Sequence, residues 1–263
     1  MIPHKDNYLI CDENNHCSIA ICSVIGQRNE QQDCAGFAIL PDSCIIVVCD
    51  GMGGLSGGKN ASNHVVNRMV NVFEECAPIP RPKSFLCNAA AVLDAEVNSL
   101  LDESGSKIRA GTTCTTVLIQ NKLIYWLSAG DSRIYWLRNG NMRQLTCDHT
   151  YGVYLKEALA EGRISNEFYQ QEIIKGAGLI SFIGIGNLNL FDCDSAEIMS
   201  GDRFLLITDG LYKYITNDEI CSIISDYSNI EDAFCALDSK ANCFAENNQI
   251  ERDNSTIAII TIK

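Results

Sequence analysis

Four aspartates stand at the ends of short apolar runs, and together they suggest a metal site. They are Asp50 in SCIIVVCDGMGG, Asp131 in WLSAGDSR, Asp209 in RFLLITDG and Asp253 in ERDNSTIAIITI. A short apolar, β-branched run predicts a buried strand, so a carboxylate at its end lies where the chain leaves the core. Several such carboxylates brought together form an oxygen-only ligand set, which suits Mg²⁺ or Mn²⁺ better than zinc. Any one of them alone could simply begin a turn, because Asp-Gly is a common turn pair.

The elements that must position these aspartates are grouped strands and paired helices. Apolar runs predict strands at about 17–25, 34–40 and 44–49. Two segments, at about 57–76 and 83–103, carry apolar residues at three- and four-residue spacing. That spacing predicts two amphipathic helices packed on a core.

The rest of the chain repeats this grouping. A meander of four strands is predicted over about 112–145, with hairpin turns at Asn121-Lys122 and Asn139-Gly140. Further elements are expected as strands at about 195–199 and 203–208, helices at 216–226 and 231–246, and a last strand at 255–262. Because no steady β-α alternation occurs, an α+β fold of antiparallel sheets covered by helices is favoured over a doubly wound parallel sheet.

Length and composition exclude several classes of protein. The 263 residues suit one large domain or two small ones, and 46% hydrophobic with 20% charged residues is typical of a globular protein. The net charge of −13 argues against a nucleic-acid partner, which would need a basic patch. The longest apolar stretches are far too short to span a membrane, and the first residues lack the apolar core of a signal peptide. A cytoplasmic location is therefore expected.

The chain has 14 cysteines, none of them in a CxxC pair. A zinc site would need such paired spacing, and a disulfide framework would imply secretion, which nothing else in the sequence supports. Many of the cysteines lie inside apolar runs, where a free thiol behaves as a small hydrophobic group. We interpret them as reduced core residues.

Eight short motifs run in order along nearly the whole chain. They are GQRNEQQD at 26–33, DGMGGLSGG at 50–58, GTT at 111–113, AGDSR at 129–133, LTCDHT at 145–150, SFIGIG at 181–186, GDRFLLITDGL at 201–211 and DNSTIAII at 253–260. Each motif is weak alone, but in this order they resemble the bacterial metal-dependent protein phosphatases, the type 2C serine/threonine phosphatases. The resemblance implies a single domain over residues 1–263 with a four-layer α-β-β-α sandwich, and the pattern of elements agrees with it.

The resemblance also implies a centre of two ions, Mn²⁺ or Mg²⁺. Asp50 would bridge the two ions, named M1 and M2, and the Gly51 carbonyl would bind M2. Asp209 and Asp253 would complete M1. Two cations that share a carboxylate lower the pKa of the water between them, which gives a hydroxide at neutral pH.

Three further roles follow from the resemblance. Asp33 would hold the metal-bound water, and Asp131 together with Asp209 would form a weaker third metal site. Arg28 would clamp the substrate phosphate, because a planar guanidinium meets two oxygens at once. Plainer roles remain open for each: a turn residue for Asp33, a hairpin turn for Asp131 and a solvated surface arginine for Arg28.

The implied activity is hydrolysis of phosphoserine and phosphothreonine in proteins by a metal-activated hydroxide that bridges the two ions. The implied partners are phosphoproteins made by a serine/threonine kinase, and the enzyme is expected to be a monomer. The segment 148–190 lacks the periodicity of its neighbours apart from a short helical pattern at 153–161. We interpret it as a flap subdomain that selects protein substrates. Its acidic residues could steer basic phosphopeptides, although each could equally belong to a solvated face: Glu157, Glu161, Glu167 and Glu172.

The chain departs from the family pattern at several positions. Gln32 stands where an acidic residue is common, so M2 could be held more loosely. Met52 occupies a position where many relatives have a histidine, and Leu55 replaces another histidine. The segment KGAGLI at 175–180 replaces a basic, Asn-containing run. None of these changes touches the four aspartates.

Several polar residues of the motifs have a plain alternative role. Thr112 and Thr113 are expected to be buried strand residues, and Ser132 and Arg133 to be structural. His149 could act as a general acid, but a hydrogen-bonding surface residue is the commoner use of a lone loop histidine.

Two other functions remain open at this point. GGLSGGKN at 53–60 nearly fits the phosphate-binding loop of nucleotide hydrolases, but Asn60 stands where the Mg²⁺-binding hydroxyl belongs and no parallel β-α series follows. The alternative within the phosphatase fold is a catalytically silent binding module. Such a module would be expected to lose metal-binding aspartates, which this chain keeps.

Overall fold

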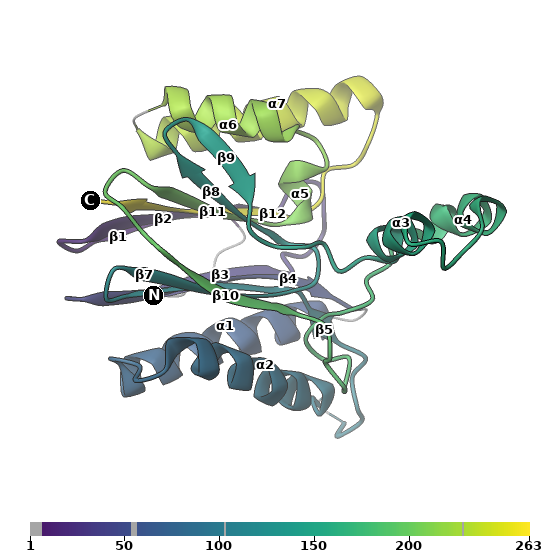
Figure 1. The fold of residues 1–263 in the computed structure, drawn as a ribbon, viewed down its shortest axis with the longest axis horizontal. Coiled ribbons are helices and arrows are strands. Elements are labelled where there is room, and N and C mark those ends of the chain that lie inside the picture. Colours follow the sequence, from purple (N-terminus) through teal and green to yellow (C-terminus); the bar gives the residue numbers. More distant parts are fainter. Residues whose placement is uncertain (1–6, 54–56, 103, 228) are drawn as a thin grey trace.

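Two antiparallel sheets lie face to face at the centre of the molecule, and helices cover their outer faces (Figure 1). The computed structural model describes residues 7–53, 57–102, 104–227 and 229–263. Sheet I has the order β1 (Tyr8–Glu13), β2 (Cys17–Val24), β12 (Ser255–Ile262), β11 (Arg203–Ile207), β8 (Arg133–Arg138) and β9 (Asn141–Gln144). Sheet II has the order β10 (Asp192–Glu197), β7 (Leu123–Ala129), β6 (Cys114–Gln120), β4 (Ser43–Met52) and β3 (Asp33–Leu40), with β5 (Gly111–Thr112) paired to β4.

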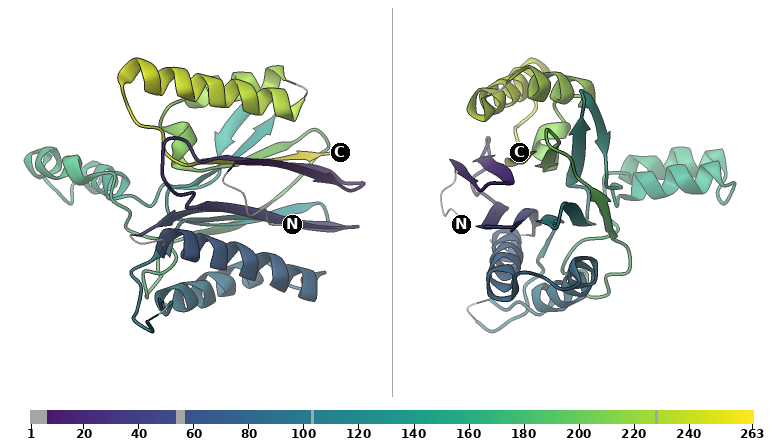
Figure 2. Two further views of the ribbon diagram at one scale, coloured as in Figure 1. Left: turned by 180° about the vertical axis from the view of Figure 1, so that it is seen from behind. Right: turned by 60° about the vertical axis from the view of Figure 1, so that its left-hand side comes forward.

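The helices form a pair on each outer face (Figures 1 and 2). Sheet II is covered by α1 (Gly57–Cys76) and α2 (Pro82–Asn98), and sheet I by α6 (Asn217–Asp226) and α7 (Ile230–Asn248). The expected four-layer α-β-β-α sandwich is therefore confirmed. No helix within the described ranges combines the length and the apolar character needed to cross a bilayer.

The strand β4 shows why the apolar runs predict this architecture. Ile45, Val47 and Cys49 belong to the apolar cluster under α1 and α2, whereas Ile46 and Val48 belong to the cluster between the two sheets. Successive side chains of a strand point to opposite faces, and here both faces are covered. The run is therefore apolar throughout instead of alternating, even though its neighbours β3 and β6 are antiparallel to it. That antiparallel pairing is inconsistent with a phosphate-binding loop of the nucleotide hydrolases.

The expected meander is interrupted at its centre. Both predicted hairpin turns are present, with positive φ at Asn121, Lys122, Asn139 and Gly140. However, β7 belongs to sheet II and β8 to sheet I, so the segment 130–132 crosses between the sheets and is not a hairpin. Gly130, with φ of +106°, turns the chain there. The sequence could not reveal this crossing, because both strands are buried and apolar whichever sheet they join.

One helix boundary differs from expectation, and two further elements were not predicted. The helix predicted over 83–103 ends at Asn98, because Asp102 accepts hydrogen bonds from the backbone of Ser104 and Ser106 and closes a turn. The edge strand β1 had no apolar run to reveal it, since its side chains are mostly exposed. The short helix α5 (Asp209–Tyr212) follows β11 directly.

A pair of short helices projects from one end of the sandwich (Figures 1 and 2). It consists of α3 (Tyr151–Ala160) and α4 (Asn166–Glu172), followed by the 3₁₀ turn η1 (Ile173–Lys175). The side chains of Thr150 and Ser165 cap the two helices. The helical pattern at 153–161 thus corresponds to α3, and the segment 148–190 contains more helix than its pattern indicated.

All fourteen cysteines are free thiols. The interpretation as core residues is correct for the five that are fully buried: Cys17, Cys34, Cys44, Cys49 and Cys114. It is wrong for five others, which are exposed: Cys11, Cys76, Cys147, Cys235 and Cys243. The buried five lie in strands with both faces covered, whereas Cys235 and Cys243 lie on the solvent side of α7.

Candidate active site

Asp33 and Asp50 lie opposite each other at one edge of sheet II. Asp33 is the first residue of β3 and is paired in register with Asp50, which is near the end of β4. Asp33 is buried, with 5% of its surface exposed, and Asp50 is half-buried. Two carboxylates are thereby held on adjacent strands by the backbone ladder itself.

Sheet I brings two more aspartates to the same end of the sandwich. β11 and β12 are antiparallel, with Ile207 opposite Ile257, so the end of one and the start of the other share an edge. Asp209 follows β11, and Asp253 precedes β12. The Thr208 hydroxyl donates to Asp33 Oδ2 at 2.9 Å, which joins the two sheets at this edge.

The electrostatics show that these carboxylates form one cluster. Burial, and after it the charges of Asp33, Asp209, Asp131 and Asp253, hold the pKa of Asp50 well above its usual range. Burial raises the pKa of Asp33 to about 7, although hydrogen bonds to hydroxyl groups oppose the shift. In the absence of a cation, carboxylates gathered in this way disfavour one another's ionised form.

Two basic side chains are paired with members of this cluster. Arg28 Nη2 donates to Asp253 Oδ2 at 2.7 Å, and Lys213 Nζ donates to Asp209 Oδ2. Burial disfavours the charged Lys213, but Asp209, together with the charges of Asp131 and Asp50, outweighs this effect and the pKa of Lys213 is raised. The guanidinium of Arg28 is half exposed, so a ligand can reach it from solvent.

Asp131 lies beside the cluster and has its own partner. It is 8% exposed, and its Oδ2 accepts a hydrogen bond from the Tyr212 hydroxyl at 3.1 Å. Arg133 lies over the Tyr212 ring at 3.6 Å and makes a two-pronged ion pair with Asp148. Arg133 is thus structural, as expected, and the turn that holds Asp131 is fixed by neighbours on both sides.

The GTT motif holds the backbone of Asp50. Thr113 donates its N–H to the Asp50 carbonyl at 2.8 Å, and its hydroxyl accepts from the Asp50 N–H at 2.9 Å. The Thr113 hydroxyl also contacts that of Ser132 at 2.7 Å, next to Asp131. Both threonines of the motif are buried, which confirms that prediction for Thr112 and Thr113. Their role is to fix the position of Asp50.

The pairs Asp50-Gly51 and Asp209-Gly210 both require glycine at the second position. A Cβ atom on Gly51 would lie 2.2 Å from the Gly58 carbonyl oxygen, and one on Gly210 would lie 1.8 Å from the Asn254 carbonyl oxygen. Both distances are far below contact, so a side chain at either position would displace the backbone. The glycines let α1 and the start of β12 approach the two aspartates closely.

Asn254 is a connecting residue that the sequence did not single out. Its Oδ1 accepts from the Gln32 N–H at 2.9 Å, and its Nδ2 donates to the carbonyls of Ile25 and Glu30. It therefore ties the segment that carries Arg28 to the segment that carries Asp253. Its place next to Asp253 was the only available signal, because its partners are more than 220 residues away in sequence.

His149 is not the surface residue that its loop position suggested. It is 3% exposed, and its ring Nδ1 accepts a hydrogen bond from the Gly130 N–H at 3.2 Å. Its backbone N–H donates to the Gly130 carbonyl at 3.0 Å. Buried and bound to the turn beside Asp131, it attaches the base of the projecting helices to the cluster. This geometry favours a structural role over a general acid.

The positions that depart from the family pattern lie in different surroundings. Met52 is half-buried at the end of β4, and Leu55 lies outside the described residues. Gln32 donates its side-chain amide to a Glu30 carboxylate at 3.1 Å. In the segment 175–180, Gly176 accepts from the Gly152 N–H at 2.8 Å, a close packing of two glycines that a basic side chain would prevent.

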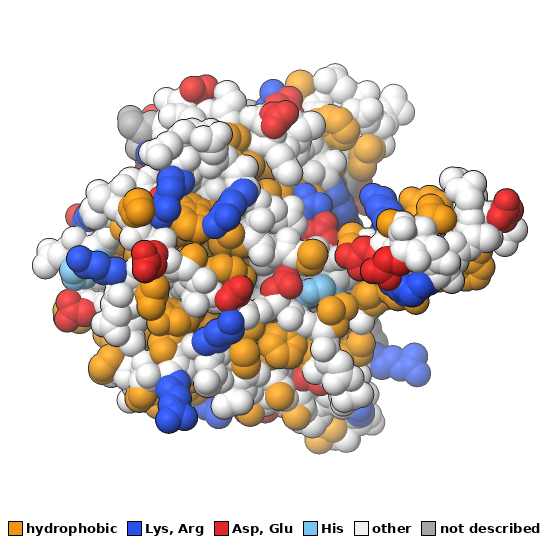
Figure 3. Space-filling model, viewed as in Figure 1, with side chains coloured by type: hydrophobic (Ala, Val, Ile, Leu, Met, Phe, Trp, Pro, Cys, Tyr) orange, Lys and Arg blue, Asp and Glu red, His pale blue; other side chains and the backbone are white. Residues whose placement is uncertain are grey.

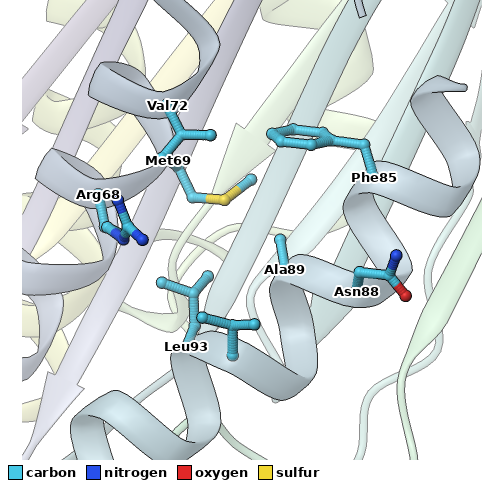
Figure 4. A pocket seen from close by; sticks show the side chains of 8 residues that line it. Arg68, Met69, Val72, Phe85, Asn88, Ala89 and Leu93 are labelled. Carbon is cyan, nitrogen blue, oxygen red and sulfur yellow. The ribbon is translucent and has the colours of Figure 1, made fainter. Parts of the chain in front are cut away.

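Two clefts are relevant to the location of the site. A cleft of about 300 Å³ is lined by Arg28, Gln32 and Asp253, so it reaches the cluster at Asp253. A second cleft, of about 230 Å³, lies between α1 and α2, where Met69, Phe85 and other side chains face one another (Figure 4). The second cleft contains none of the predicted site residues, whereas the first contains Arg28 and Asp253.

The residues at this edge fit divalent ions by their chemistry. Asp33 Oδ1 is buried and has no hydrogen-bond partner within the described residues, and the carboxylates around it are all oxygen donors. Within the same ranges, no three acidic, histidine or cysteine side chains are already arranged as ligands of one ion. Arg28 and Lys213 hold two of the carboxylates instead. A cluster of this kind requires positive charge, and a hard cation matches its donors.

Comparison with known proteins agrees with this geometry. The family model for protein phosphatase 2C matches residues 23–242. Serine/threonine phosphatase stp of Listeria welshimeri is 27% identical over 89% of this chain and 90% of that protein. Protein phosphatase PhpP of Streptococcus pneumoniae is 25% identical over 93% of this chain and 97% of that protein.

Solved structures share the fold. The S. agalactiae serine/threonine phosphatase superimposes with a TM-score of 0.77 at 24% identity, covering 94% of this chain and all of that one. The catalytic domain of the phosphatase PstP, solved with two manganese ions, superimposes with a TM-score of 0.73 at 23% identity. The match covers 94% of this chain and 98% of that one. Because the family model spans most of the chain, this protein belongs to the protein phosphatase 2C family.

Proposed function

We propose that this protein is a metal-dependent phosphatase that hydrolyses phosphoserine and phosphothreonine in other proteins. The observation that carries the proposal is the convergence of Asp33 and Asp50 from sheet II with Asp209 and Asp253 from sheet I at one solvent-accessible edge. Family membership supports the same reading. A silent binding module has no need of such a cluster, whose mutual repulsion destabilises the metal-free fold.

Asp50, Asp209, Asp253 and the Gly51 carbonyl would hold two ions, Mn²⁺ or Mg²⁺. The manganese found in the PstP structure supports this choice of metal. When bound, such ions act as Lewis acids and lower the pKa of a coordinated water. The protein contributes fixed positions for the carboxylates, because Thr113 holds the backbone of Asp50 through two hydrogen bonds.

Asp33 and Arg28 would act on the reactants. The unpaired Oδ1 of Asp33 is an acceptor for a proton of the attacking water, while its Oδ2 is fixed by Thr208. Arg28 is half exposed at the mouth of the cleft and would bind the phosphate of the substrate. Its pairing with Asp253 orients the guanidinium before substrate arrives, which lowers the cost of ordering it.

The projecting helices α3 and α4 form a flap subdomain that would select protein substrates. Their base is tied to Gly130, the residue before Asp131, so they stand next to the site. Their surface carries acidic, basic and hydrophobic side chains together (Figure 3). Glu161 and Glu172 are paired with Arg163 and Lys175, so the flap offers a mixed surface and not a simple acidic one.

The substrates would be phosphoproteins produced by a serine/threonine kinase, and the enzyme would work as a monomer. The similar proteins of Listeria welshimeri and S. agalactiae are serine/threonine phosphatases, which supports this class of substrate.

The test is turnover of para-nitrophenyl phosphate and of a phosphothreonine peptide by metal-stripped protein. We expect activity only after Mn²⁺ or Mg²⁺ is added, and no activity in EDTA. Full activity after exhaustive metal removal would refute the proposal.

A further inference from the structure

Lys213, whose side chain is half exposed, places a positive charge at the aspartate cluster. It directly follows α5 and reaches back by one helical turn to Asp209, whose Oδ2 accepts its ammonium. The charges of Asp131 and Asp50 also act on Lys213. Its partner Asp209 is only 13% exposed, so this is not an ordinary pair on the surface of a helix.

The neighbouring residue completes this arrangement. Tyr212, next to Lys213 in sequence, donates its hydroxyl to Asp131 Oδ2. Arg133 lies against the Tyr212 ring and fixes it there. One oxygen of Asp209 and one oxygen of Asp131 are thus engaged by two consecutive residues of this chain.

Asp131 and Asp209 are the two carboxylates expected to share a third metal ion, and they fit such an ion poorly here. An ion between them would lie beside the Lys213 ammonium, which is half exposed but is paired with the largely buried Asp209, and like charges this close repel each other. It would also have to displace or share the oxygens that Lys213 and Tyr212 already use.

We propose that the Lys213 ammonium serves as a built-in cation in place of a third metal ion, so that this protein binds two ions and not three. The ammonium neutralises Asp209 and Asp131 without acting as a Lewis acid. Lys213 is therefore a positioning residue that sets the metal stoichiometry. The inference rests on the proposed function, because it takes Asp50, Asp209 and Asp253 as the ligands of the two remaining ions.

The experiment measures the number of Mn²⁺ ions bound, by isothermal titration calorimetry and native mass spectrometry of the full chain. Three proteins are compared: wild type, Lys213→Met, which keeps the length of the side chain but removes its charge, and Lys213→Arg, which keeps the charge. We expect two ions in wild type and in Lys213→Arg. In Lys213→Met we expect a third ion, bound at least tenfold more tightly than any additional ion in wild type.

A second substitution locates the additional ion. Adding Asp131→Asn to Lys213→Met should return the number to two. Should Lys213→Met fail to fold, Asp131→Asn in the wild-type background gives the answer: it should leave two ions bound, and loss of an ion would overturn the inference.

The outcomes separate this inference from the proposed function. Three ions in wild type, or two ions in both wild type and Lys213→Met, would overturn the role of Lys213 and leave the two-metal phosphatase intact. No bound metal in wild type would overturn the proposed function, and the inference with it.

Discussion

Asp33 on β3 and Asp50 on β4 are direct partners in the antiparallel ladder of sheet II, and burial raises the pKa of both carboxyl groups. A sheet would not gain stability from such a pair, because like charges directly opposite each other are destabilising. The arrangement is explained if a cation completes it. The behaviour of the protein toward metals and protons should therefore reveal the site even without a substrate.

The first prediction concerns pH and stability of the metal-free protein. Burial raises the pKa of Asp33 to about 7, whereas the same group titrates near 4 in an unfolded chain. Between these values the folded state holds a proton that the unfolded state has lost. The free energy of unfolding should therefore fall as pH rises from about 4 to about 7, by up to about 1.4 kcal/mol per pH unit for this group.

Urea unfolding in EDTA at several pH values measures this slope. Asp33→Asn should reduce it, while Asp42→Asn, a change at an exposed position, should not. A slope that is the same in Asp33→Asn and in wild type would contradict the expected linkage. Added Mn²⁺ should also flatten the slope, because a bound cation favours the ionised carboxylates.

The second prediction separates the metal ligands from the phosphate ligand. Asp50→Asn and Asp209→Asn should each reduce kcat by roughly a thousandfold or more, since each removes charge needed by the metal centre. Arg28→Ala should instead raise KM by about tenfold or more and change kcat less, because Arg28 would bind the phosphate. Arg68→Ala, at a position in the cleft between α1 and α2, is the matched control. If KM is unchanged in Arg28→Ala, the assignment of a phosphate clamp is wrong.

The third prediction concerns the flap. Replacing residues 160–172 by a short Gly-Ser linker removes α4 but keeps the base that His149 fixes to Gly130. Dephosphorylation of protein substrates should fall by about tenfold or more, while turnover of para-nitrophenyl phosphate should stay within several-fold. Comparable losses on both substrates would show that the segment supports the catalytic core.

The fourth prediction concerns stability and identifies what the SFIGIG motif does. Asp94, buried on α2, accepts backbone hydrogen bonds from Gly184 at 2.8 Å, Gly186 at 3.0 Å and Leu188 at 3.1 Å. Asp94→Ala should lower the free energy of unfolding by about 3 kcal/mol, because these donors lose a charged acceptor. Thermal and urea unfolding measure the effect, and exposed Asp42→Ala should stay within about 0.5 kcal/mol of wild type. A small loss in Asp94→Ala would mean that the loop is held by other contacts.

Sequence alone predicted those parts of the fold that depend on local patterns. The strands β2, β3 and β4 and the helix α1 follow long apolar runs or clear periodicity, and they appear where expected. The crossing at Gly130 was missed because a strand buried on both faces does not reveal which sheet it joins. The edge strand β1 was missed because it buries little.

For the candidate site, the sequence likewise indicated the residues that follow a local pattern but not those that depend on contacts between distant segments. Asp50, Asp131, Asp209 and Asp253 were singled out because each lies at the end of an apolar run, and Asp33 was singled out by the resemblance to the family. Thr208, Asn254 and Lys213 were not found, because their roles depend on contacts that only the fold creates. The bond from Thr208 to Asp33, for example, joins residues 175 positions apart in the chain.

The most direct test of the account is anomalous diffraction from crystals soaked in Mn²⁺, recorded at the manganese absorption edge. We expect two anomalous peaks at the edge of the sandwich, both within about 2.2 Å of Asp50 oxygens, since hard divalent cations bind carboxylates at about that distance. Asp209 and Asp253 should complete one of the two sites, and the Gly51 carbonyl should contribute to the other. The absence of any peak beside Asp50, or strong peaks only elsewhere on the protein, would contradict the central claim that these aspartates form the metal centre of a phosphatase.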